Sequence, residues 1–140
     1  MANNETKHRV LFLEDEPIIS RIVTRILVVD GFEVDIAPNG LVARDKINSG
    51  NKYDIFIFDI RTPIMSGIEL YEYLEREHPE MTDRVIIATG DCLNDITKVF
   101  LERLKRPYLT KPYTMTQIKT AVRQILNMEP IADLEEITCP

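Results

Sequence analysis

The chain has 140 residues, of which 44% are hydrophobic and 29% are charged, and its formal net charge is −6. This size and balance fit one globular domain with a buried core and exclude an intrinsically disordered chain. The negative charge disfavours nucleic acid as a partner of this domain, because phosphate backbones select basic surfaces.

The first third of the chain alternates strand and helix patterns. Residues 1–9 are polar and lack the apolar stretch of a signal peptide, so we expect a cytoplasmic protein that does not enter a membrane. Val10–Leu13 is apolar at every position, as in a central strand of a parallel sheet. Pro17 suits a first helical turn, and an apolar stripe at helical spacing follows it up to Gly31. Glu33–Ala37 alternates polar and apolar residues, which is typical of an edge strand.

The middle of the chain repeats this alternation. Asn39 predicts the cap of a helix over residues 41–49. Ile55–Phe58 is a second fully apolar run and predicts another central strand. Ser66 precedes a glutamate by three residues, which predicts a capping box for a helix that ends near His78.

The last third contains two strand patterns and two helix patterns. Val85–Ala88 predicts a third central strand, and Tyr108–Leu109 a short fifth one. Asn94–Leu104 has a helical pattern, and the apolar residues between positions 118 and 126 share one helical face. Residues 128–140 are acidic and predict a tail or linker.

Strands that alternate with helices at this spacing predict right-handed βαβ crossovers. We therefore expect an α/β domain, doubly wound, with a five-stranded parallel sheet and helices on both faces. It should occupy residues 8–127, because the chain leaves no room for a second domain.

Chemically active residues follow four of the five predicted strands. In chain order they are Glu14, Asp15 and Glu16, then Asp59, Thr89, Thr110 and Lys111. Parallel strands end at one edge of the sheet, where doubly wound folds bind ligands. Carboxylates brought together repel, so the site needs a divalent cation, and hard oxygen ligands select Mg²⁺ or Mn²⁺ over zinc. A lysine and a hydroxyl beside that cation suit phosphoryl oxygens, and a carboxylate there can act as nucleophile.

Each of these residues also has a purely structural interpretation. Asp15 or Glu16 could cap the following helix, and Asp59 could start a turn. Thr89 could bond a neighbouring backbone group, and Lys111 could be a solvated surface charge. The convergence of four strand ends favours a reactive site over these separate explanations.

Four segments resemble the motifs of the receiver domains of two-component response regulators. They are Val10–Pro17, Tyr53–Asp59 with Pro63 and Gly67, Ile86–Thr89, and Tyr108–Tyr113. The resemblance covers residues 8–127 and implies a flavodoxin-like strand order, 2-1-3-4-5. It also implies a signalling domain that is not an enzyme, although it catalyses its own phosphoryl transfer and autodephosphorylation.

The resemblance assigns a role to each residue around the metal. Asp59 is the phosphorylated residue. Asp15, Asp59 and the backbone carbonyl of Arg61 would bind Mg²⁺ directly, and Glu14 would act on it through water. Glu14 replaces a more usual aspartate, and its extra methylene would crowd the metal.

The resemblance also implies how the signal arrives and leaves. A histidine kinase or a histidine phosphotransfer protein would donate the phosphoryl group, and an unknown downstream protein would respond. Lys111 would pair with the phosphoryl group, Thr89 would bond one of its oxygens, and Tyr108 takes the place of the family's rotating aromatic residue. The Lys111–Pro112 peptide is expected to be cis.

Other functions remain open. A pseudo-receiver would bind partners without phosphorylation, and Glu14 motivates this alternative. A phosphatase that forms an aspartyl phosphate would need a second aspartate where the chain has Arg61, and a nucleotide-binding protein would need a glycine-rich loop.

Two further expectations concern the tail and the mouth of the site. Residues 128–140 carry no DNA-binding motif, so the chain is either a stand-alone receiver or one cut from a larger protein. The sequence of Thr89–Asp91 is similar to that of receivers attached to hybrid histidine kinases.

Arg61 and Asp91 should flank the site and form an ion pair, and these two positions help set the hydrolysis rate in related receivers.

Overall fold

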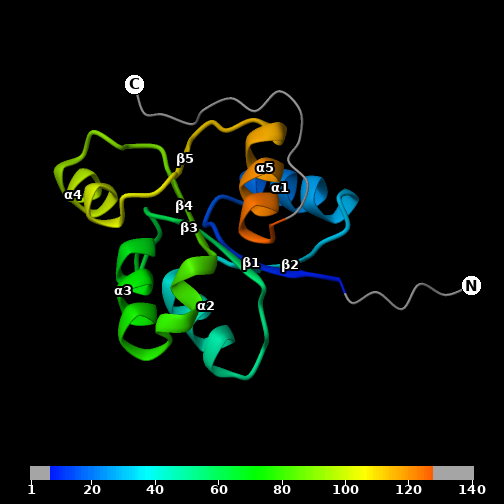
Figure 1. Ribbon diagram of the computed structural model, residues 1–140, viewed down its shortest axis with the longest axis horizontal. Coiled ribbons are helices and arrows are strands. Elements are labelled where there is room, and N and C mark those ends of the chain that lie inside the picture. The colour runs from blue at the N-terminus through cyan, green and yellow to red at the C-terminus, as the bar shows by residue number, and fades with distance from the viewer. Residues whose placement is uncertain (1–6, 128–140) are drawn as a thin grey trace, which may run out of the picture.

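The computed structural model describes residues 7–127, which form one five-stranded parallel sheet (Figure 1). Its strands are β1 (Arg9–Leu13), β2 (Glu33–Ala37), β3 (Ile55–Asp59), β4 (Val85–Thr89) and β5 (Leu109–Thr110). Their order is β2-β1-β3-β4-β5, so the predicted α/β class and strand order are confirmed. The fifth strand begins one residue later than the sequence predicted.

Helices cover both faces of this sheet. They are α1 (Pro17–Val29), α2 (Gly40–Asn48), α3 (Gly67–Glu77), α4 (Asp95–Leu104) and α5 (Met115–Ile125). Figure 1 shows α1 and α5 together on one side of the strands and α2 and α3 on the other. A short 3-10 helix, η1 (Pro79–Arg84), follows α3 and was not predicted. Pro79 ends the pattern of α3 as expected, but it also suits the first position of this new turn.

The central strands are buried on both faces, as their uninterrupted apolar runs predicted. Leu11, Leu13, Phe56 and Phe58 pack with residues of α2 and α3. Alternate residues of the same two strands enter the other core cluster, on the side of α1 and α5: Val10, Phe12, Ile55 and Ile57. Burial of these side chains contributes about 25 cal/mol per Å² of apolar surface and fixes the register of the strands.

Several helix starts match their predicted caps. The Asn39 side chain accepts a hydrogen bond from the Val42 amide at 2.9 Å. Ser66 forms the predicted capping box with Glu69 at the start of α3. Helix α1, by contrast, follows Glu16 with no side-chain cap hydrogen bond in the described part of the chain. The capping interpretation of the acidic residues after β1 is therefore wrong for Glu16.

Helix α3 begins directly against the backbone of β3. A Cβ atom on Gly67 would lie 2.3 Å from the Asp59 carbonyl oxygen, which no real side chain tolerates. The Gly67 amide also donates to the Ile60 carbonyl at 3.0 Å. This close approach fixes the end of β3, and with it the backbone of Asp59.

Within residues 7–127, no helix is long and apolar enough to span a membrane. The acidic tail predicted over residues 128–140 lies outside the described residues.

Candidate functional site

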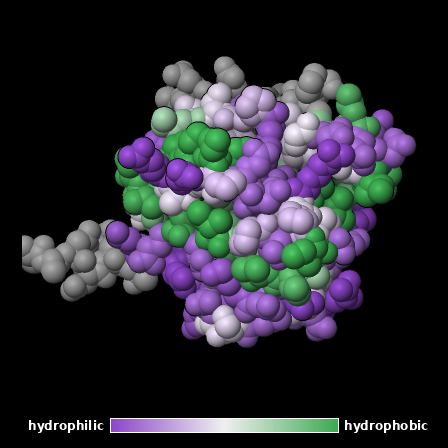
Figure 2. All heavy atoms as spheres, turned by 180° about the vertical axis from the view of Figure 1, so that it is seen from behind, coloured by the Kyte–Doolittle hydropathy of each residue, from purple (hydrophilic) through white to green (hydrophobic). Residues whose placement is uncertain are grey.

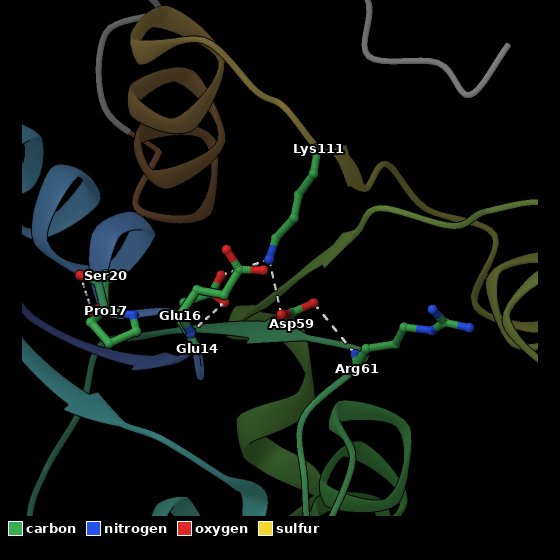
Figure 3. Close-up of polar contacts among 7 residues, drawn as sticks. All are labelled: Glu14, Glu16, Pro17, Ser20, Asp59, Arg61 and Lys111. Carbon is green, nitrogen blue, oxygen red and sulfur yellow. Dashed lines mark hydrogen bonds and ion pairs between the residues drawn. The ribbon is translucent and has the colours of Figure 1, made fainter.

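Three polar side chains from separate strands meet at the carboxyl edge of the sheet (Figure 3). Glu14 directly follows β1, Asp59 ends β3, and Lys111 directly follows β5. The Lys111 ammonium donates to Glu14 Oε1 at 2.7 Å and to Asp59 Oδ2 at 2.9 Å. Only 17% of the Lys111 side chain is exposed, so its interpretation as a solvated surface charge is wrong.

The strand register explains why these residues meet. Leu13 pairs with Phe58 across β1 and β3, so the residues that follow them, Glu14 and Asp59, lie side by side. Asp59 in turn pairs with Ala88 of β4. Because all strands are parallel, each one delivers its next residue to the same edge.

The site holds more negative than positive charge. Burial raises the pKa of Glu14, and Asp59 nearby raises it further, while Lys111 offsets only part of this effect. Burial likewise raises the pKa of Asp59 despite its bonds to Lys111. Burial alone would lower the pKa of Lys111, but its hydrogen bonds to the two carboxylates raise it. Two buried carboxylates thus share one ammonium, and a further cation would stabilise their charged forms.

A third carboxylate completes a candidate metal site. Glu14, Asp15 and Asp59 each offer an oxygen, and these three atoms lie within 4.8 Å of one another. Asp15 is exposed, whereas the other two are buried. Hard oxygen donors with excess negative charge fit Mg²⁺, as the sequence predicted. The Arg61 amide lies 3.4 Å from Asp59 Oδ1, while metal binding by the Arg61 carbonyl stays a prediction.

Glu14 has two hydrogen-bond partners that the sequence did not predict, while its action on the metal through water stays a prediction. Its Oε1 accepts from Lys111, and its Oε2 accepts from the Glu16 amide at 3.2 Å. Sequence reasoning missed these contacts, because the motif alone does not show which neighbour the longer side chain bonds.

The predicted switch residues lie on neighbouring segments: Thr89 ends β4, and Tyr108 directly precedes β5. Thr89, at the end of β4, is 1% exposed, and its hydroxyl accepts from the Asp91 amide at 3.1 Å. This is the backbone bond that the structural interpretation of Thr89 expects, and the hydroxyl hydrogen is still available as a donor. The Thr89 carbonyl accepts from the Lys111 amide at 2.8 Å, which links the two motifs. Tyr108 is half-buried and packs against the core cluster under α2 and α3.

Two smaller expectations are also met. The Lys111–Pro112 peptide is cis. At the mouth of the site, Arg61 Nη2 lies 3.5 Å from Asp91 Oδ2, with 71% and 40% of the two side chains exposed. The predicted ion pair between these two side chains is therefore present.

Residues 10–123 match the family model described as the response regulator receiver domain. The chain is 30% identical over 129 residues to the response regulator ArlR of Staphylococcus haemolyticus, an alignment that covers 91% of this chain and 57% of that protein. It is 31% identical over 120 residues to the transcriptional regulatory protein PcoR of Escherichia coli, covering 84% of this chain and 51% of that protein. The chain thus spans about half the length of these relatives.

Solved structures give the same likeness over nearly their whole length. A CheY-like response regulator receiver domain protein from Methanospirillum hungatei matches with a TM-score of 0.76 at 27% identity, covering 87% of this chain and 95% of that one. The response regulator TrrA of Thermotoga maritima, solved in complex with Mg²⁺-BeF, matches with a TM-score of 0.69 at 29% identity. That alignment covers 84% of this chain and 98% of TrrA.

Proposed function

Because the chain belongs to the response regulator receiver family, we propose that it is a signalling switch in which Asp59 accepts a phosphoryl group. The observation that carries this proposal is the contact of Asp59 with Lys111 beside two further carboxylates. The donor would be a histidine kinase or a histidine phosphotransfer protein, as two-component signalling requires.

In the proposed reaction, a carboxylate oxygen of Asp59 attacks the phosphorus atom of a phosphohistidine. A phosphorus–oxygen bond forms, the phosphorus–nitrogen bond breaks, and its electron pair returns to the imidazole nitrogen. Lys111 donates hydrogen bonds to the phosphoryl oxygens, and the Thr89 hydroxyl donates another. Both groups already lie at the same sheet edge as Asp59, which supports these roles.

Mg²⁺ suits the carboxylates of this site and would supply positive charge to the transferring oxygens. Asp15, Asp59 and the Arg61 carbonyl would hold it directly, and Glu14 would act through water. The Mg²⁺-BeF complex of TrrA supports this assignment, because that relative shares the fold at 29% identity. The raised pKa of Asp59 gives the cation a second role, since the nucleophile must be deprotonated.

The output of the switch would pass through Thr89 and Tyr108 to the face formed by α4, β5 and α5. A phosphoryl oxygen gives the Thr89 hydroxyl a new acceptor, and its inward shift frees space that Tyr108 fills. The phosphoryl group thereby favours one of two pre-existing packings. Chemical shift changes on adding beryllofluoride should spread over residues 94–127, and changes confined to the loops around Asp59 would contradict a transmitted switch. The downstream protein is unknown.

The switch would be reset by the domain itself. Water attacks the phosphorus atom, inorganic phosphate leaves, and the Asp59 carboxylate is restored. The exposed Arg61–Asp91 pair, formed by residues that lie two positions after Asp59 and Thr89, would hinder the approach of this water. A cytoplasmic location, and no binding of nucleic acid or membrane by this domain, also stay predictions; cell fractionation and a DNA-binding assay check them.

Labelling by a small phosphodonor tests the central proposal. Acetyl phosphate with Mg²⁺ should add one phosphoryl group, seen by intact-mass spectrometry, and chelation of the metal should prevent it. Asp59→Asn should abolish the adduct, while Asp54→Asn, which changes an aspartate at the opposite edge of the sheet, should retain it. An adduct on Asp59→Asn would contradict the assignment, and failure of the native protein to label would favour the pseudo-receiver alternative.

A further inference from the structure

Tyr113 carries a buried hydroxyl that no contact in the described residues explains. Its ring is half-buried and packs with the core cluster on the side of α1 and α5. Its hydroxyl oxygen is closed to solvent and has no hydrogen-bond partner among residues 7–127. A phenylalanine would fill the same space without burying an unpaired polar group.

The surroundings of this hydroxyl tie it to the phosphoacceptor site. Tyr113 and Lys111 line one groove of about 430 Å³ between α1 and the start of α5. Burial raises the pKa of Tyr113, and the negative charges of Glu14 and Asp59 raise it further. The hydroxyl therefore stays protonated, and its hydrogen is a donor near two carboxylates.

Glu14 is the carboxylate whose partners must change when the switch is used. Its side chain is fully buried, and Lys111 supplies its shortest hydrogen bond, at 2.7 Å. On the proposed function, a phosphoryl group on Asp59 draws Lys111 toward its own oxygens. Glu14 Oε1 then loses its donor in a place where a buried charge needs one.

We propose that Tyr113 is a positioning residue for the phosphorylated state, whose hydroxyl donates to Glu14 when Lys111 turns to the phosphoryl group. The inference rests on the proposed function of Asp59. In this proposal, the unpaired Tyr113 hydroxyl gains a hydrogen-bond partner only after Asp59 is phosphorylated. The hydroxyl therefore stabilises the phosphorylated state relative to the free state.

Tyr113→Phe removes only the hydroxyl, so it should weaken the phosphorylated state without weakening the free state. Because the chain has no tryptophan, we would follow binding by calorimetry and by ¹⁹F NMR of beryllofluoride. The variant should bind Mg²⁺ alone within twofold of the native protein, but should bind beryllofluoride in the presence of Mg²⁺ about tenfold more weakly. Without ligand it should unfold at the same temperature as the native protein or higher, since an unpaired hydroxyl has been removed.

Tyr53→Phe is the matched control, because the Tyr53 hydroxyl donates to Asp35 at 2.6 Å, away from the site. It should lose stability and keep its affinity for beryllofluoride. Equal beryllofluoride affinity in native protein and Tyr113→Phe, or an equal loss for Mg²⁺ alone, would overturn the inference and leave the proposed function intact. If the native protein itself fails to bind beryllofluoride, the proposed function fails and the inference fails with it.

Discussion

Two clusters of this protein bring a lysine to a carboxylate, and they differ in charge balance. At the carboxyl edge of the sheet, Lys111 lies between Glu14 and Asp59. Near the edge strand β2, Lys46 Nζ lies 3.0 Å from Asp35 Oδ1, and the Tyr53 hydroxyl donates to Asp35 Oδ2. We call the first the phosphoacceptor cluster and the second the Asp35 cluster.

The difference in charge balance shifts the pKa of the carboxylates in opposite directions in the two clusters. Burial would raise the pKa of Asp35, but the hydrogen bonds from Tyr53 and Lys46 outweigh it and lower the pKa. In the phosphoacceptor cluster, burial prevails and the pKa of both carboxylates rises. The Asp35 cluster is therefore satisfied and stabilises the fold, whereas the phosphoacceptor cluster is held together by the fold and has an excess of negative charge that the proposed cation would balance. Buried charges are usually paired one to one, and the phosphoacceptor cluster departs from this rule because two carboxylates share one ammonium. The proposed function accounts for this departure.

Removing the lysine should give the largest difference between the two clusters in the free energy of unfolding. Lys111→Met leaves two neighbouring buried carboxylates without their ammonium, and should lower the free energy of unfolding by about 3 kcal/mol. Lys46→Met leaves Asp35 with its tyrosine and partial solvent access, and should cost about 1 kcal/mol. Urea denaturation in metal-free buffer measures both values. Equal losses would mean that the two clusters do not differ in the way described.

Removing one carboxylate charge should give effects of opposite sign. Asp59→Asn leaves Glu14 and Lys111 as a balanced pair, and should raise the free energy of unfolding at neutral pH by about 1–2 kcal/mol. Asp35→Asn should lower it by a similar ~1–2 kcal/mol, because it breaks a satisfied cluster.

The pH dependence of these variants follows from the direction of the shifts. A raised carboxyl pKa costs stability as pH rises from the unfolded value, about 4, through the folded one. The gain from Asp59→Asn should therefore vanish below pH ~4, where Asp59 is protonated in both states. Asp35 has a lowered pKa, so its contribution is present above the unfolded value and is lost as pH falls through the folded one. Denaturation at several pH values checks both, and a gain from Asp59→Asn that persists at low pH would have another cause.

Mg²⁺ should act on the phosphoacceptor cluster alone. Asp15→Ala should weaken Mg²⁺ affinity about tenfold, which is ~1.4 kcal/mol, and should do so far more than Glu14→Ala. Asp35→Asn, as the control, should leave affinity unchanged. A calorimetric titration decides between the two acidic residues after β1, since equal losses would make Glu14 a direct ligand.

The smallest effect is expected from the exposed pair at the mouth of the site. Arg61→Ala and Asp91→Ala should each speed dephosphorylation by up to about fivefold, because an exposed ion pair is worth only ~0.2–1 kcal/mol. If the pair acts as one barrier to water, the double variant should be no faster than either single one. Half-lives of the phosphorylated protein measure this, and strictly multiplicative effects would show that the two side chains act separately.

The sequence predicted the fold and the convergence of the site well, because both follow from local patterns. Fully apolar strand runs and readable caps such as Asn39 set the element order, and the residue after each strand set the site. The Thr114–Gln117 capping box of α5 was readable but overlooked. The direction taken by the Glu14 carboxylate, and the bond from Tyr53 to Asp35, depend on side chains brought together by tertiary packing. No periodicity encodes such contacts.

The separation of the site residues along the chain has a consequence for biosynthesis. Lys111 bonds a glutamate 97 residues before it and an aspartate 52 residues before it. At about 5–20 residues per second, a ribosome needs on the order of 5–20 s to pass from Glu14 to Lys111. Until β5 emerges and docks on β4, the nascent chain carries its acceptor aspartate without the ammonium. The proposed phosphoryl transfer to Asp59 therefore requires that synthesis has passed Lys111 and that β5 has docked on β4.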